Sequence, residues 1–189
     1  MTARKQQQGF SLIEILVTIL IISFGLLGAT SMQLKVQSLE TDSFQRAQAM
    51  MLVDDMVSRM NLNRTDVDSY VTGLAVTSIL GYGDSQPANC AALNGVLLDQ
   101  CEWSNALKGA AEMSGASSAA TAVGAMVNAR GCIEVVTGST PPTYKVTVVW
   151  QGLTALSGPP QACGSGLYGQ EEYRRALTKL VTVANLTAP

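Results

Sequence analysis

The sequence contains no histidine, few charged residues and few aromatic residues. Of its 189 residues, 14% are charged and 5% are aromatic. Without histidine, the chain alone cannot build a Ser-His-Asp or Cys-His catalytic site, a His-ligated metal centre or an imidazole proton shuttle. Its 12 basic and 14 acidic residues give a net charge of −2. This balance excludes a strongly basic nucleic-acid binder, because no excess of cations is available to neutralise many phosphates.

Apolar residues make up 47% of the chain and are concentrated near the N-terminus. Between Phe10 and Ala29, twenty residues contain fourteen apolar side chains and two glycines. A helix of this length spans about 30 Å, the thickness of the bilayer hydrocarbon. The sequence therefore predicts a membrane-spanning helix over residues 10–32. Because Arg4 and Lys5 precede this segment, the positive-inside rule places residues 1–9 in the cytoplasm and the rest of the chain outside.

A basic start followed by an apolar run is also typical of a cleaved secretory signal. Ala29 and Ser31 offer small residues of the kind found at such cleavage sites. However, the run exceeds the roughly 7–15 apolar residues of an ordinary signal, and Glu14 lies near its start. These two features favour a retained membrane span.

The residues around that carboxylate form a specific motif. Gly9-Phe10-Ser11-Leu12-Ile13-Glu14 resembles the class III signal of type IV pilins and type II secretion pseudopilins. The resemblance implies that a prepilin peptidase cuts between Gly9 and Phe10 and methylates the new amino group of Phe10. It also implies that Glu14 neutralises the N-terminal amine of an adjacent subunit. An ionised carboxylate in hydrocarbon is costly unless paired, which favours this role over a Glu14 that merely reaches the headgroups.

The predicted helix continues past the membrane as an amphipathic segment over residues 33–61. No Pro or Gly interrupts residues 29–72, so one helix from Phe10 to about Asn61 is expected. The apolar residues of this segment recur at helical spacing and predict a face that packs on a head domain: Val36, Leu39, Ala47, Met50, Val53, Val57 and Met60. Four methionines are expected to pack in the core: Met50, Met51, Met56 and Met60.

Residues 62–189 are predicted to form the head domain, with an antiparallel meander over about 132–185. Turn-forming residues predict a loop over 61–89, and the Ala-, Gly- and Ser-rich segment 109–131 predicts a mobile connection. The expected regular elements are a short helix over 96–108 and strands over 132–137, 144–150 and 173–185, with a loop over 152–168. Tyr144, Val146, Val148 and Trp150 should share one sheet face. The order predicts an α+β fold of pilin type, with a long N-terminal helix packed on a small antiparallel sheet.

Four cysteines, Cys90, Cys101, Cys132 and Cys163, all lie in the segment predicted to be outside the membrane, where disulfides persist. No pair has the close spacing of zinc ligands, which disfavours a metal site. Three pairings are possible, and Cys90 with Cys101 and Cys132 with Cys163 is preferred. The first pair needs a helix break at Asn94-Gly95, since eleven helical residues would separate the Cα atoms by about 16 Å. The second assumes that Cys132 opens a strand at the sheet end near Cys163.

The head is similar to that of minor pilins of the type IV pilus modification protein PilV family. The matching residues are Asn89-Cys90, Cys101 with Trp103, Val148-Val149-Trp150, Cys163 and Tyr173-Arg174-Arg175. This resemblance implies a structural subunit without a cofactor that primes pilus assembly and sits at the tip. It implies partnership with prepilin peptidase, other minor pilins, the major pilin, a large tip adhesin and the inner-membrane assembly platform. The implied location is the bacterial inner membrane, with the head in the periplasm, and then the pilus.

Three alternative functions remain open at this point. A minor pseudopilin of a type II secretion system would share the N-terminal motif. A pilus-borne adhesin or other binding module would need a basic or aromatic patch on the head. Removing residues 1–9 leaves ten basic against fourteen acidic residues, a charge of −4, so nucleic acid is not expected as a partner. An enzyme would need convergent polar groups, and the acids and hydroxyls of the head have no recognisable catalytic spacing, so catalysis is not expected.

Overall fold

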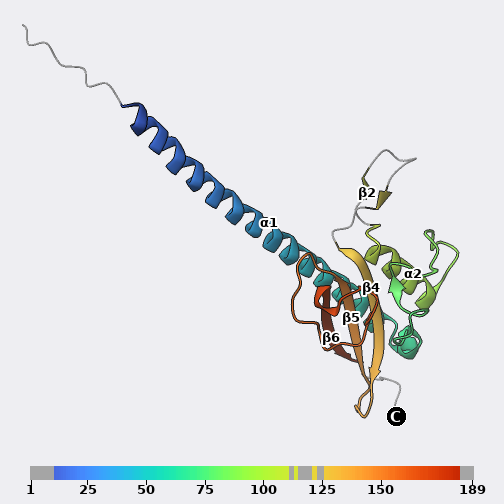
Figure 1. Cartoon of the computed structure of the whole chain (residues 1–189). Coiled ribbons are helices and arrows are strands. Elements are labelled where there is room, and N and C mark those ends of the chain that lie inside the picture. The colour runs from blue at the N-terminus through green and yellow to red at the C-terminus, as the bar shows by residue number, and fades with distance from the viewer. Residues whose placement is uncertain (1–10, 111–112, 115–120, 123–125, 184–189) are drawn as a thin grey trace, which may run out of the picture. The chain divides into compact units, whose positions relative to one another are not determined.

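A computed structural model describes residues 11–110, 113–114, 121–122 and 126–183 of the chain (Figure 1). Helix α1 extends over Leu12–Leu62. The chain divides into two compact units, Met1–Thr41 and Asp42–Pro189, which are described separately below. We call the second of them the head unit. Helix α1 ends one residue after its expected end at Asn61, while its expected start at Phe10 lies outside the described residues.

In the first unit, the large apolar side chains of α1 are exposed from Leu12 to Leu39. Several of its hydroxyl groups bond to the helix backbone: those of Thr18, Ser23 and Thr30 donate to carbonyls three or four residues earlier. The described residues contain one helix long and apolar enough to cross a membrane, and it is α1. In hydrocarbon, such internal hydrogen bonding removes the cost of the few hydroxyl groups.

The head unit is built around a four-stranded antiparallel sheet in the order β1-β4-β5-β6. The strands are β1 (Leu80–Gly81), β4 (Val127–Val136), β5 (Thr143–Gln151) and β6 (Arg174–Thr182), and a separate hairpin pairs β2 (Met113–Ser114) with β3 (Thr121–Ala122). The helical elements are α2 (Gly95–Leu107) and the 3-10 turns η1 (Arg64–Tyr70) and η2 (Glu171–Tyr173). The predicted α+β fold, with a long N-terminal helix, a small antiparallel sheet and two disulfides, is confirmed.

The buried face of α1 begins at Gln45, later than predicted. Its buried residues are Gln45, Ala49, Val53, Met56, Val57 and Met60, which recur at helical spacing. The expectation that Val36, Leu39, Ala47 and Met50 belong to this face is wrong, because all four are exposed. Ala47 and Met50 lie beside the buried stripe on the helix, whereas Val36 and Leu39 lie in the first unit, before the first buried residue of α1.

The methionine prediction is correct for two residues and wrong for two. Met56 and Met60 are fully buried in the main core, as expected. Met50 and Met51 are more than half exposed. Four methionines within eleven residues of one helix cannot all point in one direction, so only the two on the sheet-facing stripe pack inside.

Strand β5 is buried on both of its faces. Tyr144, Val146, Val148 and Trp150 share the face that contacts the main core, as predicted from their alternation. On the opposite face, Val149 belongs to a second buried cluster, together with Ile79, Cys132, Cys163 and Tyr168. The segment between β5 and β6, predicted only as a loop, therefore folds across the sheet and covers its second face.

Two strand predictions need correction. The segment 61–89 contains η1 and the edge strand β1, because Leu80 and Gly81 pair with Gly131 and Arg130 of β4. Strand β4 starts at Val127, not Cys132, so part of the segment predicted as a mobile connection is strand. Neither β1 nor the first five residues of β4 have a local strand signal, since β1 has two residues and the start of β4 follows an Ala-rich stretch. Long-range pairing forms both.

The third predicted strand, 173–185, is represented by β6, which ends at Thr182 within the described residues. Tyr173 belongs to η2 instead. Of the predicted connection 109–131, residues 111–112, 115–120 and 123–125 lie outside the described part, as do residues 184–185 of the third strand.

Trp103 of α2 joins three elements of the head unit. Its ring is fully buried and its indole N–H donates to the Leu52 carbonyl of α1 at 2.8 Å. A Cβ at Gly131 of β4 would lie 2.2 Å from this ring. Because real contacts are never this short, only glycine lets the ring approach the strand. This packing holds α2 against both α1 and the sheet.

Candidate functional site

The residues of the predicted processing site lie at the very start of the described chain or before it. Gly9 and Phe10 lie outside the described residues, so cleavage and methylation there remain predictions. Helix α1 begins two residues after Phe10. The Ser11 carbonyl accepts hydrogen bonds from the backbone N–H groups of Glu14 at 3.0 Å and Ile15 at 3.3 Å. Glu14 therefore lies in the first helical turn, where a negative charge is favourable to the helix dipole.

Glu14 is exposed on a surface that is otherwise apolar. Leu12 and Ile13 beside it are 82% and 64% exposed, and the apolar side chains that follow are exposed as well. Among the residues that the structure describes, none forms a salt bridge with Glu14. A carboxylate in an apolar surrounding is stable only when a cation compensates it.

The first disulfide fastens the loop before α2 to that helix. Cys90 and Cys101 are joined with Cα atoms 5.9 Å apart, which is the pairing preferred from the sequence. The predicted break is present, because α2 begins at Gly95, whose φ of 57° ends the preceding turn. Asn105 of α2 donates to the carbonyls of Pro87 at 3.0 Å and Ala88 at 3.2 Å. The loop is therefore held to the helix both covalently and by hydrogen bonds.

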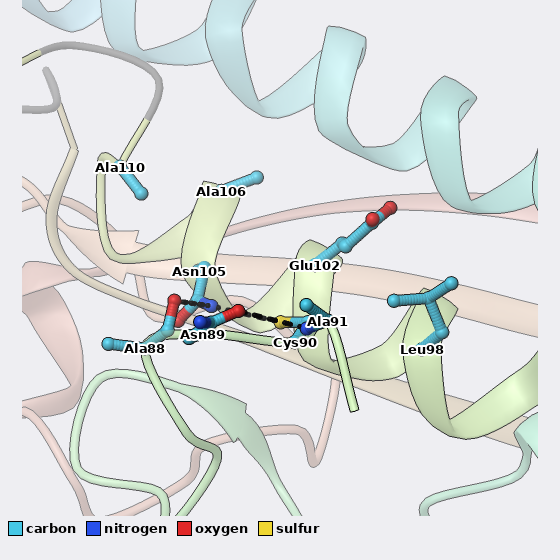
Figure 2. Close-up of a pocket in the computed structure, with 9 residues that line it drawn as sticks. All are labelled: Ala88, Asn89, Cys90, Ala91, Leu98, Glu102, Asn105, Ala106 and Ala110. Atoms are coloured by element: carbon cyan, nitrogen blue, oxygen red, sulfur yellow. Dashed lines mark hydrogen bonds between the residues drawn. The ribbon is translucent and has the colours of Figure 1, made fainter. Parts of the chain in front are cut away.

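A hollow of about 550 Å³ lies between this loop and α2 (Figure 2). Its polar side chains are engaged within the protein: Asn89 accepts from the Ala91 N–H, Asn105 holds the loop carbonyls, and Glu102 pairs with Arg59 at 2.6 Å. The rest of its lining is alanine, Leu98 and Cys90. The Asn105 contacts hold the loop to α2, and the Glu102–Arg59 pair holds α2 to α1.

Asp84 is a second anchor between the 82–89 loop and α2. Its carboxylate accepts from the Ser104 hydroxyl at 2.6 Å and the Gly81 N–H at 2.9 Å, and pairs with Lys108 at 2.5 Å. Burial alone would raise the pKa of Asp84. The hydrogen bonds from Lys108, Ser104 and Gly81 outweigh burial and hold the pKa of this carboxyl below its usual value of 3.8.

A polar cluster joins the end of α1 to η1 and α2. The Asp99 carboxylate accepts hydrogen bonds from Arg59, Asn63 and Tyr70. Burial raises the pKa of Tyr70 to about 12, and its hydrogen bond to Asp99 adds to this rise. The hydroxyl therefore stays protonated and donates. The cluster fixes the orientation of α2 relative to the end of α1.

The second disulfide fastens the 152–173 segment across the sheet. Cys132 and Cys163 are joined with Cα atoms 6.0 Å apart, again the preferred pairing. The geometric reason given for it is wrong, because Cys132 lies in the middle of β4, opposite Thr147, and not at the sheet end. Cys163 reaches it because its segment crosses the face of the sheet.

Arg174 supports the same segment from the start of β6. Its guanidinium donates to the carbonyls of Gln161 at 2.7 Å, Cys163 at 3.0 Å and Pro159 at 3.1 Å. It also pairs with Glu171, whose pKa is lowered, first by the Gly166 N–H and then by Arg174. Sequence reasoning noted Arg174 only through the family resemblance and missed this role. The sequence does not show that Arg174 is buried next to Cys163, so its supporting role becomes apparent only from the fold.

The described residues contain no group of three His, Cys, Asp or Glu side chains placed to hold a metal ion. The four cysteines are all used in disulfides. The candidate site of this chain is the motif around Glu14 at the start of α1. The contacts of Asp84, Asp99 and Arg174 hold the parts of the head unit together.

Residues 4–30 match the model of the prokaryotic N-terminal methylation motif. No curated protein and no solved structure matches the chain significantly. The matched segment includes Gly9, Phe10 and Glu14, and it indicates a type IV pilin-like or pseudopilin protein, a class of structural subunits. Together with the apolar start of α1, the motif fits membrane anchoring and incorporation into a pilus. It implies processing by prepilin peptidase and assembly with other pilins.

Proposed function

We propose that this chain is a minor pilin that primes type IV pilus assembly and sits at the pilus tip. The observation that carries the proposal is the methylation motif with Glu14 as the charged residue of an otherwise apolar helical segment. A head with two disulfides on a small antiparallel sheet agrees with a subunit that works outside the cytoplasm. The more specific assignment rests on the resemblance of the head sequence to the PilV family.

The proposal assigns a role to each part of the chain. Residues 1–9 are a cytoplasmic leader that prepilin peptidase removes, and residues 10–32 span the inner membrane once. Residues 33–61 continue the helix, and residues 62–189 form the periplasmic head. After assembly the subunit lies in the pilus, in contact with other minor pilins, the major pilin and a large tip adhesin, and the inner-membrane platform inserts it.

Glu14 supplies the assembly interaction in this account. The amino group of Phe10 created by cleavage is a cation at the start of an apolar helix, and Glu14 of a neighbouring subunit is an anion in the same surroundings. Each charge is costly in a medium of low dielectric constant, and pairing them removes much of that cost. The pair would therefore draw a new subunit into register with the one before it.

The experiment is to replace Glu14 by Gln, which removes the charge and keeps the size. We expect the variant to be cleaved and inserted in the membrane, because an amide is less costly in hydrocarbon than a carboxylate. It should be strongly depleted from sheared pili, measured by immunoblot. Glu40→Gln, which changes an exposed carboxylate of the same helix outside the predicted span, is the matched control and should assemble normally. Incorporation of Glu14→Gln at wild-type levels would refute the pairing role.

A minor pseudopilin of a type II secretion system is the second candidate, because the same motif marks both classes. The two are separated by deleting the gene. The pilus proposal predicts loss of surface pili with protein secretion unchanged. Loss of secretion with normal piliation would assign the chain to the secretion system.

A further inference from the structure

The two edges of the sheet in the head unit differ in whether other segments bond to their backbone groups. On the β4 edge, the backbone of Ile133 is bonded by residues 72–73: its carbonyl accepts from Thr72 and Gly73 at 3.0 and 3.1 Å, and its N–H donates to the Thr72 hydroxyl. Strand β1 covers the next stretch of the same edge. The opposite edge is β6, whose nine residues pair with β5 and with no other strand of the described residues (Figure 1).

The outward-facing residues of β6 follow from its register. Gly152 donates to the Tyr173 carbonyl and Val183 to the Pro142 carbonyl, and both pairs continue the β5–β6 register. Hydrogen-bonded pairs in an antiparallel ladder recur at every second residue. Odd-numbered residues of β6 therefore bond to β5, and the backbone groups of Ala176, Thr178, Leu180 and Thr182 point away from the sheet.

In the part of the chain that the structure describes, no hydrogen bond reaches these outward backbone groups. Alternating unpaired N–H and C=O groups along an extended strand are a template for another strand. Natural proteins often protect such an edge with charged side chains. Here Lys179 and Arg175 are turned to the helix side, where they pair with Asp54 at 2.6 Å and Asp42 at 3.6 Å.

A groove adjoins the same edge. It is lined by Met50, Val53 and Asp54 of α1 and by Leu177, Thr178 and Lys179 of β6. The side chain of Thr178 lies on the sheet face opposite α1, where its hydroxyl bonds to Thr147. Because Thr178 nevertheless lines the groove together with residues of α1, the groove lies along the outer edge of β6. Met50 is 52% exposed here, and Leu180, on the other face of β6, is 60% exposed.

We infer that the outer edge of β6 receives an extended segment of another, non-identical subunit as a fifth strand. The inference rests on the proposed function, which makes such subunits neighbours of this chain. The added strand satisfies the backbone groups of Ala176, Thr178, Leu180 and Thr182. One of its side chains enters the groove beside Met50, and the next contacts Leu180. Its centre therefore carries consecutive uncharged, apolar or β-branched residues, because both neighbours are apolar and the nearby charges are already paired.

The test places a photocrosslinking amino acid at Met50 of the full-length protein in piliated cells. Leu180→Pro and Thr178→Pro each remove one outward N–H and put a ring in the path of the added strand, while the β5–β6 ladder keeps its hydrogen bonds. Leu180→Thr keeps the N–H and is the matched control. We expect a crosslink to one segment of a different subunit, identified by peptide mapping, that falls at least tenfold in both proline variants and persists in the control.

A crosslink that is absent, that joins two copies of this chain, or that is unchanged by both prolines overturns the inference. A second measurement needs no proline: the crosslinker at Leu180 should give at least tenfold more product with the same subunit than the crosslinker at the exposed Val76, and equal yields overturn the inference as well. Immunoblots of sheared pili separate the two proposals. Normal incorporation into pili with a failed crosslink would refute the β6 inference and leave the pilus role standing. A crosslink to a secretion pseudopilin would support strand addition at β6 and refute the pilus role.

Discussion

Helix α1 has two parts that differ in what covers their apolar side chains. From Leu12 to Leu39, its large apolar residues are exposed, and nothing in the described chain packs on them. Between Gln45 and Met60, which belong to the head unit, six residues are buried by the rest of that unit. The second part is stabilised by the core of its own chain. The first part has to find its apolar surroundings elsewhere, in lipid or in neighbouring subunits.

This difference separates two kinds of variant. Substitutions that reach the buried stripe or its partners should change the stability of the head. Substitutions in the first part should change membrane insertion and assembly, and leave the head intact. Unless another measurement is stated, the free energy of unfolding of the full-length protein is measured in detergent by urea titration.

The largest effect is expected at Trp103, which holds α2 on α1 and β4. Trp103→Ala leaves a large cavity in the main core and removes the indole hydrogen bond to the Leu52 carbonyl, and should destabilise the head by about 3–5 kcal/mol. Leu97→Ala, on the exposed side of the same helix, is the control and should change stability by less than about 0.5 kcal/mol. Equal effects of the two changes would contradict the assigned packing of α2.

The two disulfides should differ in their contributions. Cys132 and Cys163 close a loop of 31 residues, and Cys90 and Cys101 close one of 11. Loop-closure entropy predicts losses of about 4 and about 3 kcal/mol when each pair is replaced by alanine. Urea midpoints of the two double variants test the order. A greater loss from the 90–101 pair would show that contacts around α2 outweigh chain entropy.

Acid should weaken the head through Asp84. Because the pKa of Asp84 is lower in the folded state than its usual 3.8, its stabilising contribution is complete above about pH 4 and is lost as the pH falls through the lower folded value. Asp84→Asn should cost about 1–3 kcal/mol at pH 7 and flatten the decline in stability between pH 5 and pH 2. The exposed Asp66→Asn is the control. A variant whose stability falls with acid as steeply as the wild type would exclude this role for Asp84.

The smallest effect is expected in the exposed part of α1. Ile21 is 66% exposed, so Ile21→Ala should leave the unfolding of the head unchanged within about 0.5 kcal/mol. The comparison with Trp103→Ala tests whether the two parts of α1 are independent. A loss of more than about 1 kcal/mol from Ile21→Ala would show that the first part packs on the head.

Much of the fold could be predicted because its signals are local. The long uninterrupted helix, the short helix around Trp103 and the alternation in Tyr144–Trp150 all lie within single segments. Strand β1 could not be predicted, since two residues in a turn-rich stretch become a strand only by pairing with Gly131 and Arg130. The same holds for Arg174, whose partners Pro159, Gln161 and Cys163 approach it only after the chain has crossed the sheet.

For the candidate site, the sequence is more informative than the tertiary structure. Gly9, Phe10 and Glu14 are readable as a motif because the peptidase and the membrane act on contiguous sequence, and tertiary structure adds little there. The anchors of the head, such as Asp84 and Asp99, were missed because an acidic residue in a polar loop or helix has no sequence signature of burial. Their roles depend on Lys108, Ser104 and Arg59, which are distant along the chain.

Mass spectrometry of the mature protein tests the central claim most directly. If the chain is a processed pilin-like subunit, its N-terminus is Phe10 and carries one methyl group on the amino nitrogen. An N-terminus near Met32 would instead show removal of the apolar segment as an ordinary secretory signal, and an unprocessed Met1 would show that prepilin peptidase does not act on this chain. Either of these results would contradict the account.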